Sequence, residues 1–171
     1  MVGSLPPGER SEVLGVLLSA HPELQGEVER MASAMLLSVS VQQIASEVES
    51  ALVGIPVDSL AARAGRVRGR GYVHESEAAW ELLEEAVGPF RSDCERRAAP
   101  GVDKAATSEA VGIVVGLHRV REPEMGTVMA YASDDAAPEL AVSVLDLSAT
   151  LGVVIPDEAP GTYWSSWSDR L

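Results

Sequence analysis

The sequence predicts an all-α protein, with about seven helices packed as antiparallel hairpins in a single domain. Apolar residues recur at steps of three and four in most segments, and no long run of alternating polar and apolar residues predicts a strand. The predicted connections are short. Aromatic residues make up only 4% of the 171 residues, so we expect a core of aliphatic side chains.

Two apolar stripes, each on one face of a helix, predict the first two helices. The residues of the stripes are Leu14, Leu17 and Leu18, then Leu24, Val28, Met31 and Met35. Ser40 predicts the N-cap of a third helix, Gln43 completes a capping box there, and Gly54 predicts its end. A short fourth helix is expected over residues 58–64.

The second half of the chain predicts a long helix and three further ones. The apolar face of the long helix consists of Trp80, Leu83, Val87, Phe90 and Cys94. Residues 111–117 are apolar on all sides, which suits a buried helix or a buried strand. The alanines before this segment favour a helix over residues 104–120, and two more helices are expected near residues 128–132 and 134–152.

Residues 79–86 resemble a helix of HEAT or TPR repeats, although no fixed period of about 34 or 40 residues supports a regular solenoid. Residues 1–155 are expected to form the helical domain, and residues 156–171 a tail. The tail contains Tyr163, Trp164 and Trp167. Because burying large rings is favourable, we expect it to dock on the domain or on a second subunit.

Lys and Arg total 13 against 26 Asp and Glu, a formal charge of −13. This excess of acid disfavours nucleic-acid binding, which needs a cationic surface. Cys94 is the only cysteine, so no intrachain disulfide can form, and it is predicted to be a core residue. No segment predicts a membrane span or a secretory signal, so a cytoplasmic location is expected.

No recognisable catalytic motif is present, and neither a metal nor a cofactor is predicted. His21, His74 and His118 lie far apart without a second ligand at metal-binding spacing, so each is interpreted as structural. His118 ends the apolar helix of residues 104–120, where a positive imidazole would suit the helix dipole.

Four arginines within eight residues are the most unusual local feature: Arg63, Arg66, Arg68 and Arg70. The glycines among them predict a loop. The guanidinium groups suit phosphate or carboxylate. Three interpretations are open: pairing with the chain's own acids, a phosphate or nucleic-acid site, and a site for an acidic protein.

Gly112 and Gly116 lie four residues apart in the apolar helix of residues 104–120. Two small residues on one face let another helix approach closely. That neighbour is either a helix of a second copy, which would make the pair a homodimer contact, or a helix of the same chain.

These observations favour a non-catalytic helical module for protein–protein interaction that self-associates. Two alternatives remain: an acidic antagonist of a basic protein, similar in kind to an immunity protein, and a small-molecule-binding helical bundle or unrecognised enzyme. A pocket lined by Trp80, Phe90 and Cys94 would favour the last of these.

Overall fold

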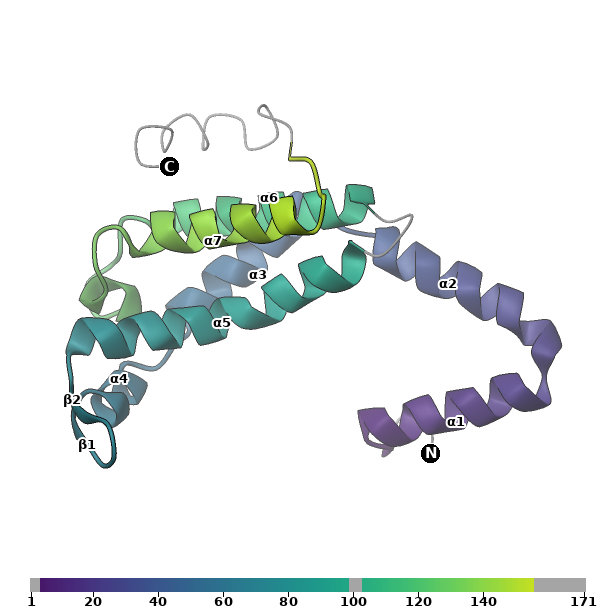
Figure 1. Cartoon of the computed structure of the whole chain (residues 1–171), viewed down its shortest axis with the longest axis horizontal. Coiled ribbons are helices and arrows are strands. Elements are labelled where there is room, and N and C mark those ends of the chain that lie inside the picture. Colours follow the sequence, from purple (N-terminus) through teal and green to yellow (C-terminus); the bar gives the residue numbers. More distant parts are fainter. Residues whose placement is uncertain (1–3, 99–102, 156–171) are drawn as a thin grey trace. The chain divides into compact units, whose positions relative to one another are not determined.

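The structure is a computed structural model that describes residues 4–98 and 103–155 (Figure 1). These residues form seven α-helices and one small sheet, so the predicted all-α fold is confirmed. The helices are α1 (Pro7–Ala20), α2 (Gln25–Leu37), α3 (Val41–Val53), α4 (Val57–Arg63), α5 (Glu75–Arg97), α6 (Asp103–Arg119) and α7 (Ala136–Thr150). Short 3-10 helices, η2 (Pro22–Leu24) and η3 (Val128–Tyr131), precede α2 and α7. A HEAT-like or TPR-like repeat stays a prediction.

The chain divides into two units, Met1–Ser38 and Val39–Leu171. The sequence predicts no boundary at this position. The first unit consists of α1, η2 and α2, and none of their residues is buried. The two helices that the apolar stripes predict are present as α1 and α2. Met31 and Met35 of the second stripe are 60% and 77% exposed.

In the second unit, α6 lies against α3, α5 and α7 (Figure 1). Its buried residues include Ile113, Val114 and Val115, which are consecutive and therefore point to different sides of the helix. A helix with neighbours on several sides needs apolar residues all round. This explains the apolar stretch of residues 111–117 and confirms that it is helical rather than a strand.

The contact between α3 and α6 is close because of two glycines. A Cβ atom on Gly112 would lie 2.6 Å from the Cβ of Ile44, and one on Gly116 would lie 2.7 Å from the Cβ of Val48. Both distances are too short for a side chain, so only glycine fits. The two glycines therefore face a helix of their own chain, the intrachain alternative to a dimer contact.

Local signals set where α3 and α5 begin. The hydroxyl of Ser40 accepts a hydrogen bond from the backbone N–H of Gln43 at 3.4 Å, as predicted for the N-cap of α3. The side chain of Gln43 donates to Glu47 instead, so the reciprocal half of the capping box is not formed. His74 caps α5, where its Nδ1 accepts from the backbone N–H of Ser76 at 3.2 Å.

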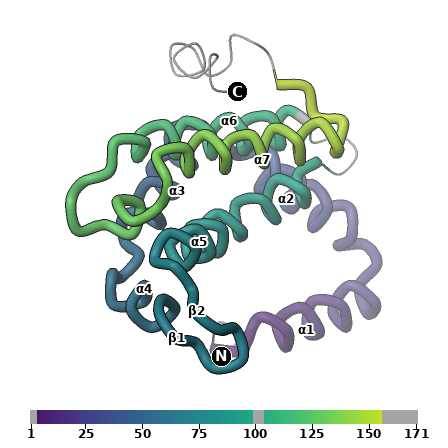
Figure 2. The backbone as a smooth tube through the Cα atoms, turned by 60° about the vertical axis from the view of Figure 1, so that its left-hand side comes forward, coloured from purple at the N-terminus to yellow at the C-terminus, as the bar shows by residue number. Residues whose placement is uncertain are grey.

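A β-hairpin joins α4 to α5 where the sequence predicts a loop (Figure 2). The strands are β1 (Gly65–Val67) and β2 (Gly71–Val73), which pair antiparallel. The turn is possible because Gly69 has a φ of +87°, which most residues avoid. The loop prediction is wrong because the glycines that suggest a loop are also the residues that a tight hairpin needs.

Candidate functional site

The two faces of the hairpin differ in character. Val73 is buried in the core and Val67 packs against it. Arg66 and Tyr72 are directly paired across the strands, on the other face, because side chains alternate along a strand. The hairpin is therefore attached to the helices by one face and exposes an arginine and a tyrosine on the other. We call residues 63–73 the arginine hairpin.

Two of its four arginines are held by glutamates of α5. Arg63 donates hydrogen bonds from Nη1 and Nη2 to the two carboxylate oxygens of Glu85, both at 2.7 Å. Arg70 donates from Nη1 to Glu81 at 3.1 Å, and its Nη2 also lies against that carboxylate. Hydrogen bonds from these arginines lower the pKa of Glu85 and of Glu81, so both carboxylates stay ionised.

The other two arginines are exposed. Within residues 4–98 and 103–155, Arg66 and Arg68 make no ion pair. They line a shallow surface hollow with Gly69, Gly71 and Tyr72, and Tyr72 is 74% exposed. The four predicted arginines therefore separate into two that fix the hairpin and two that face solvent. Pairing with the chain's own acids accounts for the first two only.

The other residues predicted to bind do not join this site. Gly112 and Gly116 contact α3, as described above. Tyr163, Trp164 and Trp167 lie outside the described residues, so docking of the tail stays a prediction.

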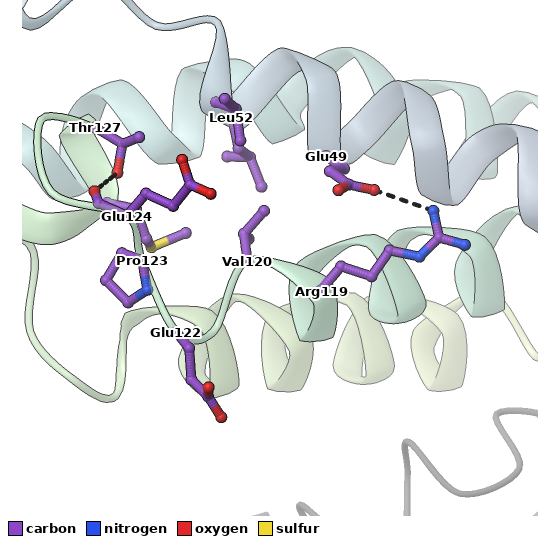
Figure 3. A pocket seen from close by; sticks show the side chains of 10 residues that line it. Glu49, Leu52, Arg119, Val120, Glu122, Pro123, Glu124 and Thr127 are labelled. Carbon is purple, nitrogen blue, oxygen red and sulfur yellow. Dashed lines mark hydrogen bonds and ion pairs between the residues drawn. The ribbon is translucent and has the colours of Figure 1, made fainter.

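A separate pocket lies where α3 and α6 end, beside the loop that follows α6 (Figure 3). We call it the α3–α6 pocket, and its volume is about 240 Å³. Leu52, Val120 and Met129, all buried, supply its apolar surface. Its polar lining consists of Glu49, Arg119, Glu122, Glu124 and Thr127. The structure therefore combines an apolar floor with a mainly acidic border.

The charged side chains that line this pocket differ in whether they form ion pairs. Arg119 donates to Glu49 and Ser46 at 3.1 Å each and to Gln42 at 2.6 Å. Its guanidinium is thus occupied along α3 (Figure 3). Glu122 borders the pocket, but its side chain is directed away from the apolar floor, and its carboxylate lies 3.3 Å from the guanidinium of Arg121. The carboxylate of Glu124 makes no ion pair in the described part of the chain.

A turn after α6 positions Glu124. The carbonyl oxygen of Glu124 accepts hydrogen bonds from the hydroxyl of Thr127 at 2.8 Å and from its backbone N–H at 3.2 Å (Figure 3). This turn holds the loop beside the ends of α3 and α6. The Glu124 carboxylate and the Glu49–Arg119 pair consequently border the same apolar floor.

A buried ion pair links α5 to α6. Arg97 Nε lies 3.1 Å from an oxygen of Glu109, whose side chain is 1% exposed. Among the described residues, no group donates a hydrogen bond to either carboxylate oxygen of Glu109. Burial raises the pKa of Glu109, against the effect of Arg97, and Asp93 and Glu47 add to the rise. This pair lies within the packed interior and lines neither surface site.

Cys94 is buried beside this pair, as predicted for a core residue. Its Sγ lies 3.7 Å from the carbonyl oxygen of Ala106 on α6. Burial, with the nearby charge of Glu109 as a smaller cause, raises the pKa of the thiol to about 11. The thiol is therefore protonated near neutral pH, which does not suit a nucleophile.

His118 is buried rather than positioned as a cation. Its pKa is lowered by burial and by the charge of Arg121, which donates to the His118 carbonyl oxygen at 2.8 Å. The lowered pKa favours the neutral imidazole, because a charge is costly to bury. In the residues that the structure describes, no three His, Cys, Asp or Glu side chains gather as metal ligands. No helix among them could cross a membrane.

Sequence reasoning missed the α3–α6 pocket. Its lining comes from positions between 49 and 129, and no spacing in the sequence brings these together. The pocket does not include Trp80, Phe90 or Cys94, which the sequence suggested as a lining. The hairpin, in contrast, could have been found in the sequence. Polar and apolar residues alternate on both sides of the turn, with Val67 before it and Val73 after it, and such alternation is typical of strands.

Comparison with models of protein families, with curated proteins and with solved structures finds no match for this chain. The function is therefore inferred from the residues of the chain itself.

Proposed function

We propose that this chain is a non-catalytic interaction module whose arginine hairpin binds an acidic segment of a protein. The proposal rests on one observation: within the part of the chain that the structure describes, only two of the four arginines of the hairpin are engaged by glutamates. Arg63 and Arg70 are engaged by α5, whereas Arg66 and Arg68 are exposed and have no ion pair among the described residues.

The hairpin is suited to binding because its backbone is already ordered before a partner binds. Its backbone pairs in register, and bidentate contacts from Arg63 and Arg70 fix it to α5. A surface that is ordered before binding loses less conformational entropy when a partner arrives. The planar guanidinium of an arginine matches a carboxylate in a bidentate manner. The exposed ring of Tyr72 adds apolar area beside these charges.

The charge of the chain favours an acidic protein over a nucleic acid as the partner. A nucleic-acid site needs several cations along a phosphate backbone, and affinity falls steeply when few are present. In the described part of the chain, the hairpin presents two exposed guanidinium groups that make no ion pair, on a protein with a formal charge of −13. Two carboxylates of a short acidic segment would match this number, whereas a duplex would meet repulsion from the remaining surface.

The proposal can be tested by fluorescence anisotropy with a labelled glutamate-rich peptide. We expect the double variant Arg66→Ala, Arg68→Ala to weaken binding by on the order of tenfold. The matched control is Arg30→Ala, Lys104→Ala, which removes two exposed cations elsewhere. It should bind as the unaltered protein does.

Equal weakening in both double variants would mean that the peptide responds only to net charge, and the proposal would fail. Tighter binding of a single-stranded RNA than of the peptide would also contradict it. Circular dichroism of each variant establishes that the helices are intact before binding is compared.

A further inference from the structure

We propose that the protein self-associates through these two surfaces, with the arginine hairpin of one copy docking on the α3–α6 pocket of another. This rests on the proposed function, because it names a second copy as an acidic partner of the hairpin. Both surfaces belong to the unit Val39–Leu171, so every copy carries one of each.

The pocket is complementary to the exposed face of the hairpin. Its floor of Leu52, Val120 and Met129 offers apolar contact to the ring of Tyr72 or to the stem of an arginine. The carboxylate of Glu124, without an ion pair in the described part of the chain, offers a partner to a guanidinium.

The one cation in the pocket lining does not oppose this contact. Arg119 is shared among Glu49, Ser46 and Gln42, all on α3. Its charge is offset by Glu49 at 3.1 Å. With the charge of Arg119 offset in this way, the carboxylate of Glu124 gives the pocket an excess of negative charge.

The hairpin and the pocket are separate surfaces of one copy. Arg63 and Arg70 fix the hairpin to α5, and the hollow lined by Arg66, Arg68 and Tyr72 shares no residue with the pocket. The proposed contact between hairpin and pocket therefore joins two molecules.

Because the protein is strongly acidic, a contact between two copies needs local groups of positive charge, and Arg66 and Arg68 are such groups. Two molecules with a formal charge of −13 repel each other, and salt near physiological strength screens that repulsion beyond about 8 Å. Attraction must then come from local groups, and exposed arginines without internal partners supply it. If each hairpin meets the other copy's pocket, the contact is reciprocal and closes as a two-fold dimer.

The decisive experiment is a reciprocal charge exchange followed by sedimentation. The hairpin variant carries Arg66→Glu and Arg68→Glu, and the pocket variant carries Glu124→Arg. Each alone should dimerise on the order of tenfold more weakly than the unaltered protein, because like charges then meet in both contacts. Mixed in equal amounts, they should form a heterodimer, since each altered surface then meets one of opposite charge. Glu139→Arg is the control, because it makes the same change of charge at an exposed residue of α7 that does not line the pocket.

A monomeric unaltered protein at micromolar concentration would overturn this inference. So would a mixture of the two variants that remains monomeric, or a Glu139→Arg variant that weakens the dimer as much as Glu124→Arg does. The peptide titration separates the two proposals: if the hairpin variant loses peptide binding while no dimer exists, the proposed function stands and self-association through the pocket falls.

Discussion

Arg63 donates two hydrogen bonds of 2.7 Å to the two carboxylate oxygens of Glu85, and this contact fixes the start of the hairpin to α5. The residues that hold the hairpin are thus distinct from those that it presents. Removing the contact should change how well Arg66 and Arg68 are positioned without removing either.

The substitution Arg63→Ala should loosen the hairpin. The backbone N–H of Arg70, which donates to the Val67 carbonyl oxygen at 3.1 Å, should then exchange its hydrogen faster. Peptide affinity should fall by about threefold, because the free hairpin samples more conformations. The control Arg96→Ala breaks an ion pair with Asp93 that lies within α5, away from the hairpin, and should change neither quantity. Unchanged hydrogen exchange in Arg63→Ala would contradict the positioning role.

The close contact of α3 with α6 predicts the effect of Gly112→Ala. A new Cβ 2.6 Å from that of Ile44 forces the helices apart, and the free energy of unfolding should fall by about 1–3 kcal/mol. Gly88→Ala is the control, because nothing lies within 4 Å of a Cβ there. In the interior of α5 this change should stabilise the protein by about 0.5–1 kcal/mol. Urea unfolding measures both, and equal effects would refute the packing role.

The buried Glu109 predicts a dependence of stability on pH. A carboxyl group whose pKa is raised by folding contributes stability below its ordinary pKa and loses that contribution as the pH rises through the raised value. Over the pH range that lies above the ordinary pKa of a glutamate, this group should therefore lower the free energy of unfolding. Glu109→Gln removes the titration, so the difference in stability between the unaltered protein and the variant should change across this range.

His118 acts in the opposite direction. Its lowered pKa means that folding keeps the imidazole neutral, and stability is lost as the pH falls through the ordinary pKa of histidine. The comparison with Glu109→Gln separates the two groups, since His118 titrates in both proteins. A difference in stability that stays constant with pH would show that Glu109 does not titrate as its burial implies.

The thiol of Cys94 should react slowly in the folded protein. With a pKa of about 11 and a buried Sγ, it is neither ionised nor accessible near neutral pH. We expect iodoacetamide to label it on the order of a hundredfold faster in denaturant than in native buffer. Rapid labelling of the native protein, measured by mass spectrometry, would contradict this burial.

Much of the helical architecture could be predicted from local signals. Ser40 and Gly54 mark the ends of α3, and the spacing of Leu83, Val87 and Cys94 marks the buried face of α5. These signals are local because capping and periodicity depend on residues a few positions apart. The helical nature of residues 111–117 could not be decided from periodicity alone, since the surrounding helices make all sides apolar.

What the sequence could not supply depends on contacts between distant residues. It showed four arginines together, but the glutamates that engage Arg63 and Arg70 could be identified only once α5 was placed beside the hairpin. The α3–α6 pocket likewise joins Leu52 to Met129. Apolar stripes in α1 and α2 were visible, yet periodicity states which residues share a face and not what covers it.

The most direct measurement maps the binding surface by nuclear magnetic resonance. Titration of the glutamate-rich peptide into isotope-labelled protein should shift the backbone amide signals of residues 66–72 first, in proportion to occupancy, and leave those of α7 unchanged. Shifts that cluster on other elements while the signals of Arg66, Arg68 and Tyr72 stay in place would contradict binding by the arginine hairpin.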